Sequence, residues 1–409
     1  MEGLSTPRSG RRSSFRRSLS IKLAVVALSL LACEVALQIG SVWSVTIRRT
    51  LMPLWELNAP TVPDSRLVRR GNPDHREHDS AGYRNPSRLR QADIVVLGDS
   101  HAYGPALAAD GWPRRTAQEL GRSVYNMALP GYGPGHSLLQ LDEALALTPR
   151  LVVVAPYFGN DFFETHVLAR RHPQLLAGID PALREAAAAE DRRRAIEQEV
   201  GRLFAVAAAQ RAQHWVSSHM KLYGLARALR THLSSPPATP AILSRDFALA
   251  AAALTPDERR YASPLDAGTW RTVLTSAYRH QVLDDSDPRI RLGFEAARAA
   301  LLTMHERCRA AGIPLLVVLL PTKESVFWPR VRDPAAHPGL EGLVANEARL
   351  RGELIAALAA REIPHVNVLR PLRSSPAQTY FEDVDGHPNA TGHAVIAATV
   401  TEHARRLLR

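Results

Sequence analysis

The stretch DIVVLGDSHAYG, residues 93–104, decides the fold, because a run of apolar residues ends there on a short polar turn. The run IVVL at 94–97 has the length and the absence of polar alternation that are typical of a strand buried on both faces. Gly98 permits a tight turn, and Asp99 can hydrogen-bond to neighbouring backbone N–H groups. Ser100 therefore stands between a strand and a helix, where the turn presents its hydroxyl group.

Similar apolar runs recur along the chain and alternate with helical patterns. Further strands are predicted at 123–128, 151–155, 313–320 and 364–368, and helices at 105–120, 136–147, 291–311, 341–360 and 390–408. This alternation predicts an α/β fold with a mainly parallel sheet. In such a sheet, ligands bind beyond the carboxyl ends of the strands, which is where Ser100 lies.

The composition indicates a folded protein that does not bind nucleic acid. The chain has 409 residues, of which 45% are hydrophobic, so it can bury a large core. The formal net charge is +11, but residues 1–22 alone supply +5 of it. Because the excess of positive charge is concentrated in this tail, a membrane explains it better than a nucleic-acid partner.

The segment 23–47, LAVVALSLLACEVALQIGSVWSVTI, is long and apolar enough to cross a bilayer as a helix. The basic tail 1–22 would stay in the cytoplasm and send the remaining chain outside. The single charge, Glu34, costs about 2.5–3.5 kcal/mol near mid-span, and either protonation or a partner helix could relieve it. The alternatives are a lipoprotein modified at Cys33 and a cleaved signal peptide. All three would export the domain, and we expect a single-pass protein of a bacterial-type inner membrane with its domain in the periplasm or outside the cell.

The rest of the chain divides by composition. Residues 48–92 are rich in Pro, Asn, Asp and Arg and are predicted to form a stalk. Residues 93–164 and 289–409 contain the predicted strands and form one domain. Residues 165–288 separate these two parts, are rich in Ala and Arg with helical spacing, and are predicted to be a helical insertion.

No metal or cofactor is expected. Cys33 and Cys308 are the only cysteines, so the chain has neither a disulfide framework nor a cluster of thiolate ligands. His75 and His78 have the identity of metal ligands, but they lie in a polar loop and are expected to be solvated.

The turns after the strands offer the groups that a nucleophilic serine needs, which are a base, a residue that orients the base, and donors for an oxyanion. NMALPGYG follows the second strand and contains Gly131, whose backbone N–H could be donated. APYFGNDFFE follows the third strand and contains Asn160, which has a side-chain amide. DVDGHPNATGH precedes the last helix and contains Asp385 and His387. Together with Ser100, these residues form a candidate active site.

The blocks GDSH, PGYG, GND and DGHPNATGH resemble, in order, the four sequence blocks of the SGNH (GDSL-type) hydrolase superfamily, and the lead-in with its anchor resembles the membrane-anchored exported branch. The resemblance implies a flavodoxin-like three-layer α/β/α sandwich and ester chemistry without metal or cofactor. It implies that Ser100 is the nucleophile and also a backbone oxyanion donor. Gly131 and Asn160 would be the other donors, His387 the general base, and Asp385 the residue that orients it.

The sequence departs from the family pattern in its last block and after the serine. The family commonly has two residues between the final Asp and His, whereas one separates Asp385 from His387 and three separate Asp383 from it. Asp385 is preferred because a single-residue spacer also occurs in exported acyltransferase-like members, and Asp383 stays open. His101 replaces the usual leucine and either contacts substrate or is simply a polar residue at the lip of the crevice. His393 is expected to bond within the last helix.

The resemblance predicts a serine-dependent ester hydrolase that acts outside the cytoplasmic membrane through an acyl-serine, with O-acetyl groups on carbohydrate as the first candidate substrate. One alternative is an O-acyltransferase that decorates cell-envelope or exopolysaccharide, supplied by a membrane partner protein. A lipolytic esterase or thioesterase acting on lipid esters, and a non-catalytic carbohydrate-binding module, are the others. These choices follow from family analogy and not from individual residues.

Overall fold

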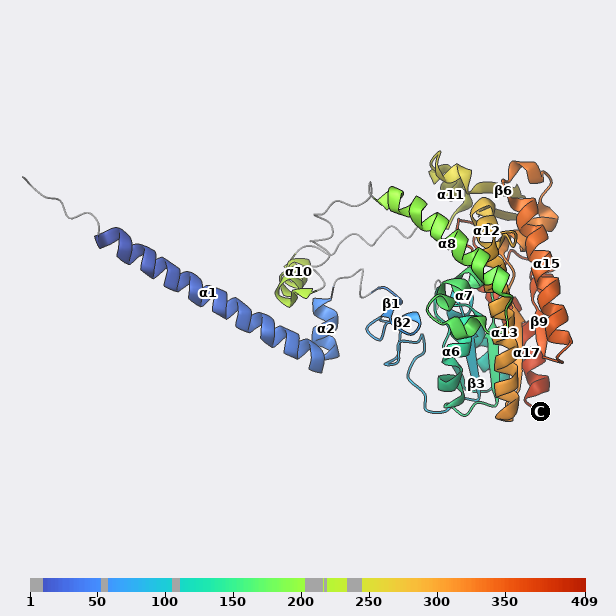
Figure 1. Cartoon of the computed structure of the whole chain (residues 1–409), viewed down its shortest axis with the longest axis horizontal. Helices are drawn as coiled ribbons and strands as arrows, with labels where there is room; N and C mark the ends of the chain where they lie inside the picture. Colours follow the sequence, from blue (N-terminus) through green and yellow to red (C-terminus); the bar gives the residue numbers. More distant parts are fainter. Residues whose placement is uncertain (1–9, 53–57, 105–110, 203–215, 217–218, 234–244) are drawn as a thin grey trace, which may run out of the picture. The chain divides into compact units, whose positions relative to one another are not determined.

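The computed structural model describes residues 10–52, 58–104, 111–202, 216, 219–233 and 245–409 (Figure 1). Its contacts divide the chain into two compact units. The smaller comprises residues 1–59 and 202–240, and the larger comprises residues 60–201 and 241–409. The predicted α/β domain lies in the larger unit.

The larger unit is built on a five-stranded sheet in the order β4-β3-β5-β8-β9, with every neighbouring pair parallel. The pairing of β3 with β5 runs from Ile94 opposite Leu151 to Gly98 opposite Ala155. All residues of β3, β5 and β8 are buried, as their apolar runs predict. The strands are β3 (Ile94–Gly98), β4 (Val124–Asn126), β5 (Leu151–Ala155), β8 (Leu315–Leu319) and β9 (His365–Asn367).

Helices cover both faces of this sheet. Crossovers between parallel strands are right-handed. The chain passes from β3 to β4 in one direction along the sheet, so the helix that connects them lies on one face. It then passes from β4 to β5, β8 and β9 in the opposite direction, so the helices of these connections lie on the other face. On the first face α5 packs against α17, and on the second α13 packs against α6, α7 and α15. The strand order and the layers confirm the predicted flavodoxin-like arrangement. These helices are α5 (Trp112–Leu120), α6 (Pro134–Leu145), α7 (Asp161–Ala169), α13 (Pro288–Ala310), α15 (Leu340–Ala359) and α17 (Ala390–Leu407).

The predicted helix at 105–120 differs in its start. A short helix, α4 (Ser100–Tyr103), directly follows β3, and α5 begins at Trp112. Residues 105–110 lie outside the described residues. Gly104 ends α4 in a left-handed conformation with φ +69°, which a glycine adopts without steric cost.

Residues 60–92 differ from the expected stalk, because they belong to the larger unit. They contain an antiparallel hairpin, and Tyr83 lies in the hydrophobic core. The buried carboxylate of Asp79 accepts hydrogen bonds from the Tyr125 hydroxyl at 2.7 Å and from the Tyr83 backbone N–H at 3.2 Å. A polar, turn-rich segment therefore packs on the domain, because its polar groups find partners there. The hairpin strands are β1 (Thr61–Asp64) and β2 (Val68–Gly71).

Residues 165–288 also differ from the expected helical insertion. Residues 202–240 belong to the smaller unit, and the remainder carries an antiparallel hairpin in addition to helices. Gly268 turns this hairpin with φ +81°, and Trp270 packs edge-on against Phe327. The first strand has the sequence SPLDA, in which only Leu265 is buried, so no continuous apolar run marks it. The elements are α8 (Pro181–Arg202), α11 (Phe247–Ala253), β6 (Ser263–Ala267), β7 (Trp270–Leu274) and α12 (Ser276–Leu283).

The smaller unit contains α1 (Gly10–Trp43), α2 (Val45–Leu51) and α10 (Lys221–Leu233). Within α1, the 24 residues Ser20–Trp43 have a mean hydropathy of 2.1, which suits either a membrane span or a signal sequence. The Glu34 carboxylate accepts the backbone N–H groups of Lys221 and Leu222, both at 2.8 Å. A helix of the same chain thus provides a partner for this charge, through the first backbone N–H groups at its N-terminus.

Candidate active site

Ser100 is the first residue of α4, directly beyond the carboxyl end of β3. The Asp99 side chain caps this helix by accepting the N–H of His101 at 2.9 Å. A Cβ atom at Gly98 would lie 3.0 Å from the carbonyl oxygen of Ala155 on β5, so the two strands approach most easily with a glycine there. The turn holds Ser100 half-buried at the edge of the sheet where a doubly wound fold binds its ligands.

Three of the predicted residues form a continuous hydrogen-bonded chain. The Nε2 atom of His387 lies 2.8 Å from the Oγ atom of Ser100. The Nδ1 atom of the same ring lies 2.5 Å from Oδ1 of Asp385, which also accepts the His387 backbone N–H at 2.9 Å. The Ser100 hydroxyl has a second acceptor in Oδ2 of Asp99, at the longer distance of 3.2 Å. The structure therefore brings together a hydroxyl, an imidazole and a carboxylate from positions 287 residues apart.

The two candidate aspartates occupy different places. Asp383 Oδ1 accepts the backbone N–H of Asp385 at 3.0 Å, whereas Asp385 contacts the His387 ring. The other oxygen of Asp385 accepts a hydrogen bond from Arg245 Nη1 at 3.0 Å. Burial alone would raise the pKa of Asp385, but the hydrogen bonds from His387 and Arg245 outweigh it and hold that pKa well below its usual range. The carboxylate beside the imidazole is therefore ionised at neutral pH.

A buried lysine supports the loop that carries these residues. Lys323 follows β8, is 0% exposed, and is the first residue of α14 (Lys323–Phe327). Its Nζ atom donates to the backbone carbonyl oxygens of Val273 at 2.8 Å, Asp383 at 2.9 Å and Asp385 at 3.1 Å. Burial lowers the pKa of Lys323 to about 8, although the neighbouring carboxylates of Glu324, Asp383 and Asp385 oppose this shift. Sequence analysis missed this residue, whose only signal is a charge placed three residues after the predicted strand 313–320.

Arg279 lies on another side of the same loop. Its Nη2 atom is 2.9 Å from the position that a Cβ atom would take on Gly386, between Asp385 and His387. Its guanidinium also lies 5.6 Å from the centre of the Tyr157 ring. The guanidinium thus fills the space beside Gly386, which explains the glycine spacer of the DGH block.

Gly131 and Asn160 follow the two strands that flank β3. Gly131 lies beyond β4 with φ +79°, and Asn160 directly precedes α7, beyond β5. Since β3 pairs with both β4 and β5 and all three strands are parallel, their carboxyl ends meet on the two sides of Ser100. Asn160 makes no side-chain capping bond to α7, although this is the usual function of an asparagine at that position.

Glu164 is a further residue that sequence analysis missed. It lies one helical turn after Asn160, and its backbone N–H donates to the Asn160 carbonyl oxygen at 3.0 Å. Burial raises the pKa of Glu164 to about 7, while the charge of Arg69 and the interaction with the Asn160 side chain oppose the rise. Its sequence signal is only its position one turn into the helix after the GND block.

His101 does not lie at an exposed lip. Its side chain is 1% exposed and stacks on Tyr157 with ring centres 3.6 Å apart. Its Nδ1 atom lies 3.2 Å from Oδ2 of Asp99, and its Nε2 atom lies 3.2 Å from the Gly386 carbonyl oxygen. The ring therefore joins the serine turn to the histidine loop by packing and hydrogen bonds, which leaves no exposed surface for a substrate contact.

The other histidines singled out in the sequence have structural partners. His393 accepts the Trp112 backbone N–H of α5 at its Nδ1 atom, 3.3 Å away, so the expected bond within its own helix is replaced by one between helices. His78 is buried, with Nδ1 2.8 Å from the Asn72 carbonyl oxygen and Nε2 2.8 Å from the Tyr103 hydroxyl. It is therefore not the solvated loop residue that the sequence predicted. Within the described part of the chain, no group of three His, Cys, Asp or Glu side chains is arranged to hold a metal ion.

Comparisons with known proteins give structural neighbours alone. No family model and no curated protein matches the sequence. Among solved structures, the chain resembles a protein from Desulfitobacterium hafniense described as lipolytic and of the G-D-S-L family, with a TM-score of 0.36 and 11% identity over 76% of this chain and 98% of that chain. It also resembles a GDSL-like lipase from Bacteroides thetaiotaomicron, with a TM-score of 0.33 and 12% identity over 76% and 87% of the two chains. A structure of TesA has a TM-score of 0.32 and 14% identity over 77% and 98%. The first two are GDSL-type proteins by their descriptions.

Proposed function

We propose that the chain is a serine-dependent ester hydrolase in which Ser100 attacks the carbonyl carbon of an ester. The observation that carries this proposal is the pair of distances at His387, 2.8 Å from Nε2 to the Ser100 hydroxyl and 2.5 Å from Nδ1 to Asp385. With an ionised carboxylate at Nδ1, the hydrogen of the neutral ring resides there and Nε2 is left as the acceptor. This is the protonation state that a general base requires.

The proposed reaction has two steps. In the first, the Ser100 oxygen bonds to the ester carbon while its proton moves to Nε2 of His387, and that proton then leaves with the alcohol as the ester bond breaks. In the second, Nε2 takes a proton from water and the resulting hydroxide attacks the acyl-serine. The bond between the acyl carbon and the Ser100 oxygen then breaks, the proton returns to that oxygen, and the carboxylic acid leaves. Asp385 stabilises the imidazolium that forms in each step and keeps the ring in position.

The oxyanion of each tetrahedral intermediate needs donors on the far side of Ser100 from His387. We propose the backbone N–H groups of Ser100 and Gly131 and the side-chain amide of Asn160 for this role. The support is topological, since these groups follow the three adjacent parallel strands β4, β3 and β5. A preorganised donor of this kind commonly contributes about 10²–10³ in turnover.

For the substrate, we propose O-acetyl groups on an exported carbohydrate, hydrolysed outside the cytoplasmic membrane. The apolar segment Ser20–Trp43 supports an exported or anchored enzyme. The half-buried Ser100 and His387 suit an ester carried on a larger molecule. An acceptor sugar hydroxyl in place of water would turn the same acyl-serine into an O-acyltransferase.

The proposal is tested by labelling the full chain with a fluorophosphonate probe. We expect a covalent adduct on Ser100 and none in Ser100→Ala, with Ser286→Ala as a control that removes a hydroxyl in the loop before α13. A folded protein that leaves the probe unreacted would contradict the proposal and favour a non-catalytic binding module.

A second assay separates hydrolysis from transfer. We expect acetate to be released from an acetylated oligosaccharide at a rate that an added unacetylated oligosaccharide does not change. Appearance of the acetyl group on the added sugar, with a matching loss of free acetate, would assign the chain to the transferases. A strong preference for long-chain esters over acetyl esters would instead favour a lipolytic enzyme.

A further inference from the structure

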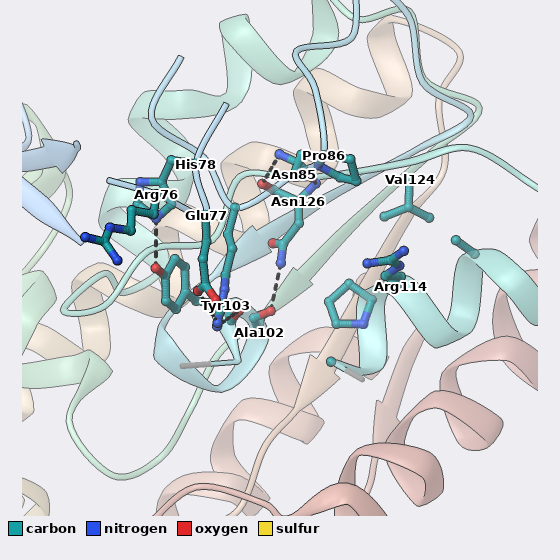
Figure 2. A pocket seen from close by; sticks show the side chains of 14 residues that line it. Arg76, Glu77, His78, Asn85, Pro86, Ala102, Tyr103, Arg114, Val124 and Asn126 are labelled. Carbon is teal, nitrogen blue, oxygen red and sulfur yellow. Dashed lines mark hydrogen bonds and ion pairs between the residues drawn. The ribbon is translucent and has the colours of Figure 1, made fainter. Parts of the chain in front are cut away.

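A cavity of about 500 Å³ lies against the helix that carries Ser100 (Figure 2). Ala102 and Tyr103 of α4 form part of its wall, and Asn126 at the end of β4 forms another. Arg76 and Arg114 lie on opposite sides of these residues in the view of Figure 2. Ala102 lies two residues after Ser100 on the same short helix, so the cavity and the Ser100 hydroxyl share α4 as a neighbour.

The walls of the cavity are held by internal hydrogen bonds. The Asn126 side chain donates to the Ala102 carbonyl oxygen at 2.8 Å, and its backbone N–H donates to Asn85 Oδ1 at 2.9 Å. Tyr103 is held by its hydroxyl contact with His78, and Arg84 donates to the Tyr103 carbonyl oxygen at 3.4 Å. A cavity with such walls is largely formed before a ligand arrives, which reduces the entropy lost on binding.

The lining carries an excess of positive charge. Three arginines, Arg76, Arg84 and Arg114, face one carboxylate, Glu77, which is ion-paired with Arg84. Burial lowers the pKa of His78 to about 4, so that ring is uncharged at neutral pH. Among the residues that the structure describes, neither Arg76 nor Arg114 has a carboxylate partner. Their two charges are therefore available to a ligand.

The start of α5 adds to this field. Gly111, Pro113 and Arg114 line the cavity, and Gly111 occupies the N-cap position without a side-chain cap. The partial positive charge of a helix N-terminus favours an anion at this place. The arginine side chains and the N-terminus of α5 both favour a negatively charged ligand. The planar guanidinium groups of the arginines match a carboxylate better than a neutral hydroxyl.

We propose that this cavity binds an anionic sugar residue, carrying a carboxylate, next to the acylated residue that reaches Ser100. The volume lies within the range of sites for small ligands and suits a sugar unit. The inference rests on the proposed function and deepens it, because it assigns the substrate to acidic acylated polysaccharides. Arg114, at the start of α5, would bind the carboxylate, and Arg76 would add to the positive field from the other side of the cavity. The polar wall at Asn85 and Asn126 would face the ring hydroxyls.

The test compares O-acetylated trigalacturonate with its carboxyl-reduced counterpart, which has the same acetyl group and no charge. We expect wild-type protein to have a lower KM for the acidic substrate, and added salt to raise that KM alone. In the double variant Arg76→Gln/Arg114→Gln, we expect the KM for the acidic substrate to rise about tenfold, with kcat little changed. Hydrolysis of p-nitrophenyl acetate should stay at the wild-type rate, since this ester does not reach the cavity.

A matched control is Arg122→Gln, which removes an arginine just after α5 that lies 3.7 Å from Asp93 and outside the cavity. An equal KM for the two trisaccharides, or a KM ratio unchanged in the double variant, would overturn the inference. Continued hydrolysis of p-nitrophenyl acetate would then show that the proposed function survives.

Binding to Ser100→Ala provides a readout that does not depend on turnover. Calorimetry should show trigalacturonate binding more tightly than its carboxyl-reduced form, and the double variant should remove the difference. Binding of glucose 6-phosphate with no binding of trigalacturonate would overturn the carboxylate assignment in favour of a phosphate site.

Discussion

Ser100 and His387 reach the same edge of the sheet by different routes. Ser100 follows β3 directly, and the fully buried β3 and β5 on which its turn rests are bonded to each other along their whole length. His387 lies in a loop before α17, and two carbonyl contacts of Lys323 and one hydrogen bond of Arg245 hold that loop. Ser100 is therefore positioned by the sheet, whereas His387 depends on side chains that are remote in sequence. Substitutions far from the chemistry should thus disturb His387 more than Ser100.

The largest effect is expected from Asp385→Asn. An amide cannot stabilise the imidazolium and favours the wrong ring tautomer, so kcat should fall by about 10³–10⁴. Asp383→Asn is the matched control and should stay within about tenfold of wild type, because Asp383 contacts backbone and not the ring. Steady-state kinetics with a short acyl ester measure both variants. A greater loss in Asp383→Asn would make Asp383 the orienting residue.

Asn160→Ala tests the side of the site that the sheet positions. Loss of one oxyanion donor should lower kcat by about 10²–10³ with little change in KM. Asn367→Ala removes the same amide at the end of β9, where it accepts the Leu369 N–H at 3.1 Å, and should leave kcat near wild type. Equal losses in the two variants would show that the effect comes from folding.

Lys323→Met tests the support of the histidine loop. A displacement of this loop by about 1 Å should lower kcat by about 10–100-fold, while fluorophosphonate still reaches Ser100, although more slowly. Circular dichroism under native conditions should show a folded protein. Unchanged kcat in the folded variant would mean that the loop holds its position without the lysine.

The same variant has a signature in the pH dependence of stability. The folded pKa of Lys323 is about 8, below the 10.5 of an unperturbed lysine, so between these values the unfolded chain binds more protons than the folded one. As the pH rises through this window, the free energy of unfolding of the wild type should therefore increase by up to about 3 kcal/mol more than that of Lys323→Met. Urea denaturation at pH 7.5 and 10 measures the difference. The same change in unfolding free energy with pH for the two proteins would contradict the lowered pKa of Lys323.

The smallest effect is expected from Arg245→Gln. Its guanidinium is 39% exposed, so solvent screens its interaction with Asp385, and kcat should fall only about two- to fivefold. Arg271→Gln removes a comparably exposed arginine that lies 3.7 Å from Glu382 and serves as the control. A loss as large as that of Asp385→Asn would show that Arg245 alone determines the orientation of the carboxylate.

The sequence could predict the five strands of the parallel sheet, and the hydroxyl, imidazole and carboxylate that the structure brings together. Buried parallel strands are continuous apolar runs, and Ser100 and Asn160 directly follow two of them, so local pattern and topology suffice. It could not predict Lys323, because one lysine after a strand looks the same whether it is solvated or buried. It also misjudged residues 60–92, where Asp79 is buried by partners that lie in another strand.

By itself, then, the amino-acid sequence determined the layered α/β architecture and the residue types that can attack an ester, since both depend on patterns only a few residues long. The tertiary structure alone decided which aspartate contacts His387, which lysine supports its loop, and where Arg76 and Arg114 leave uncompensated charge. These outcomes depend on distances and burial between residues far apart in the chain, which become defined only when the core packs.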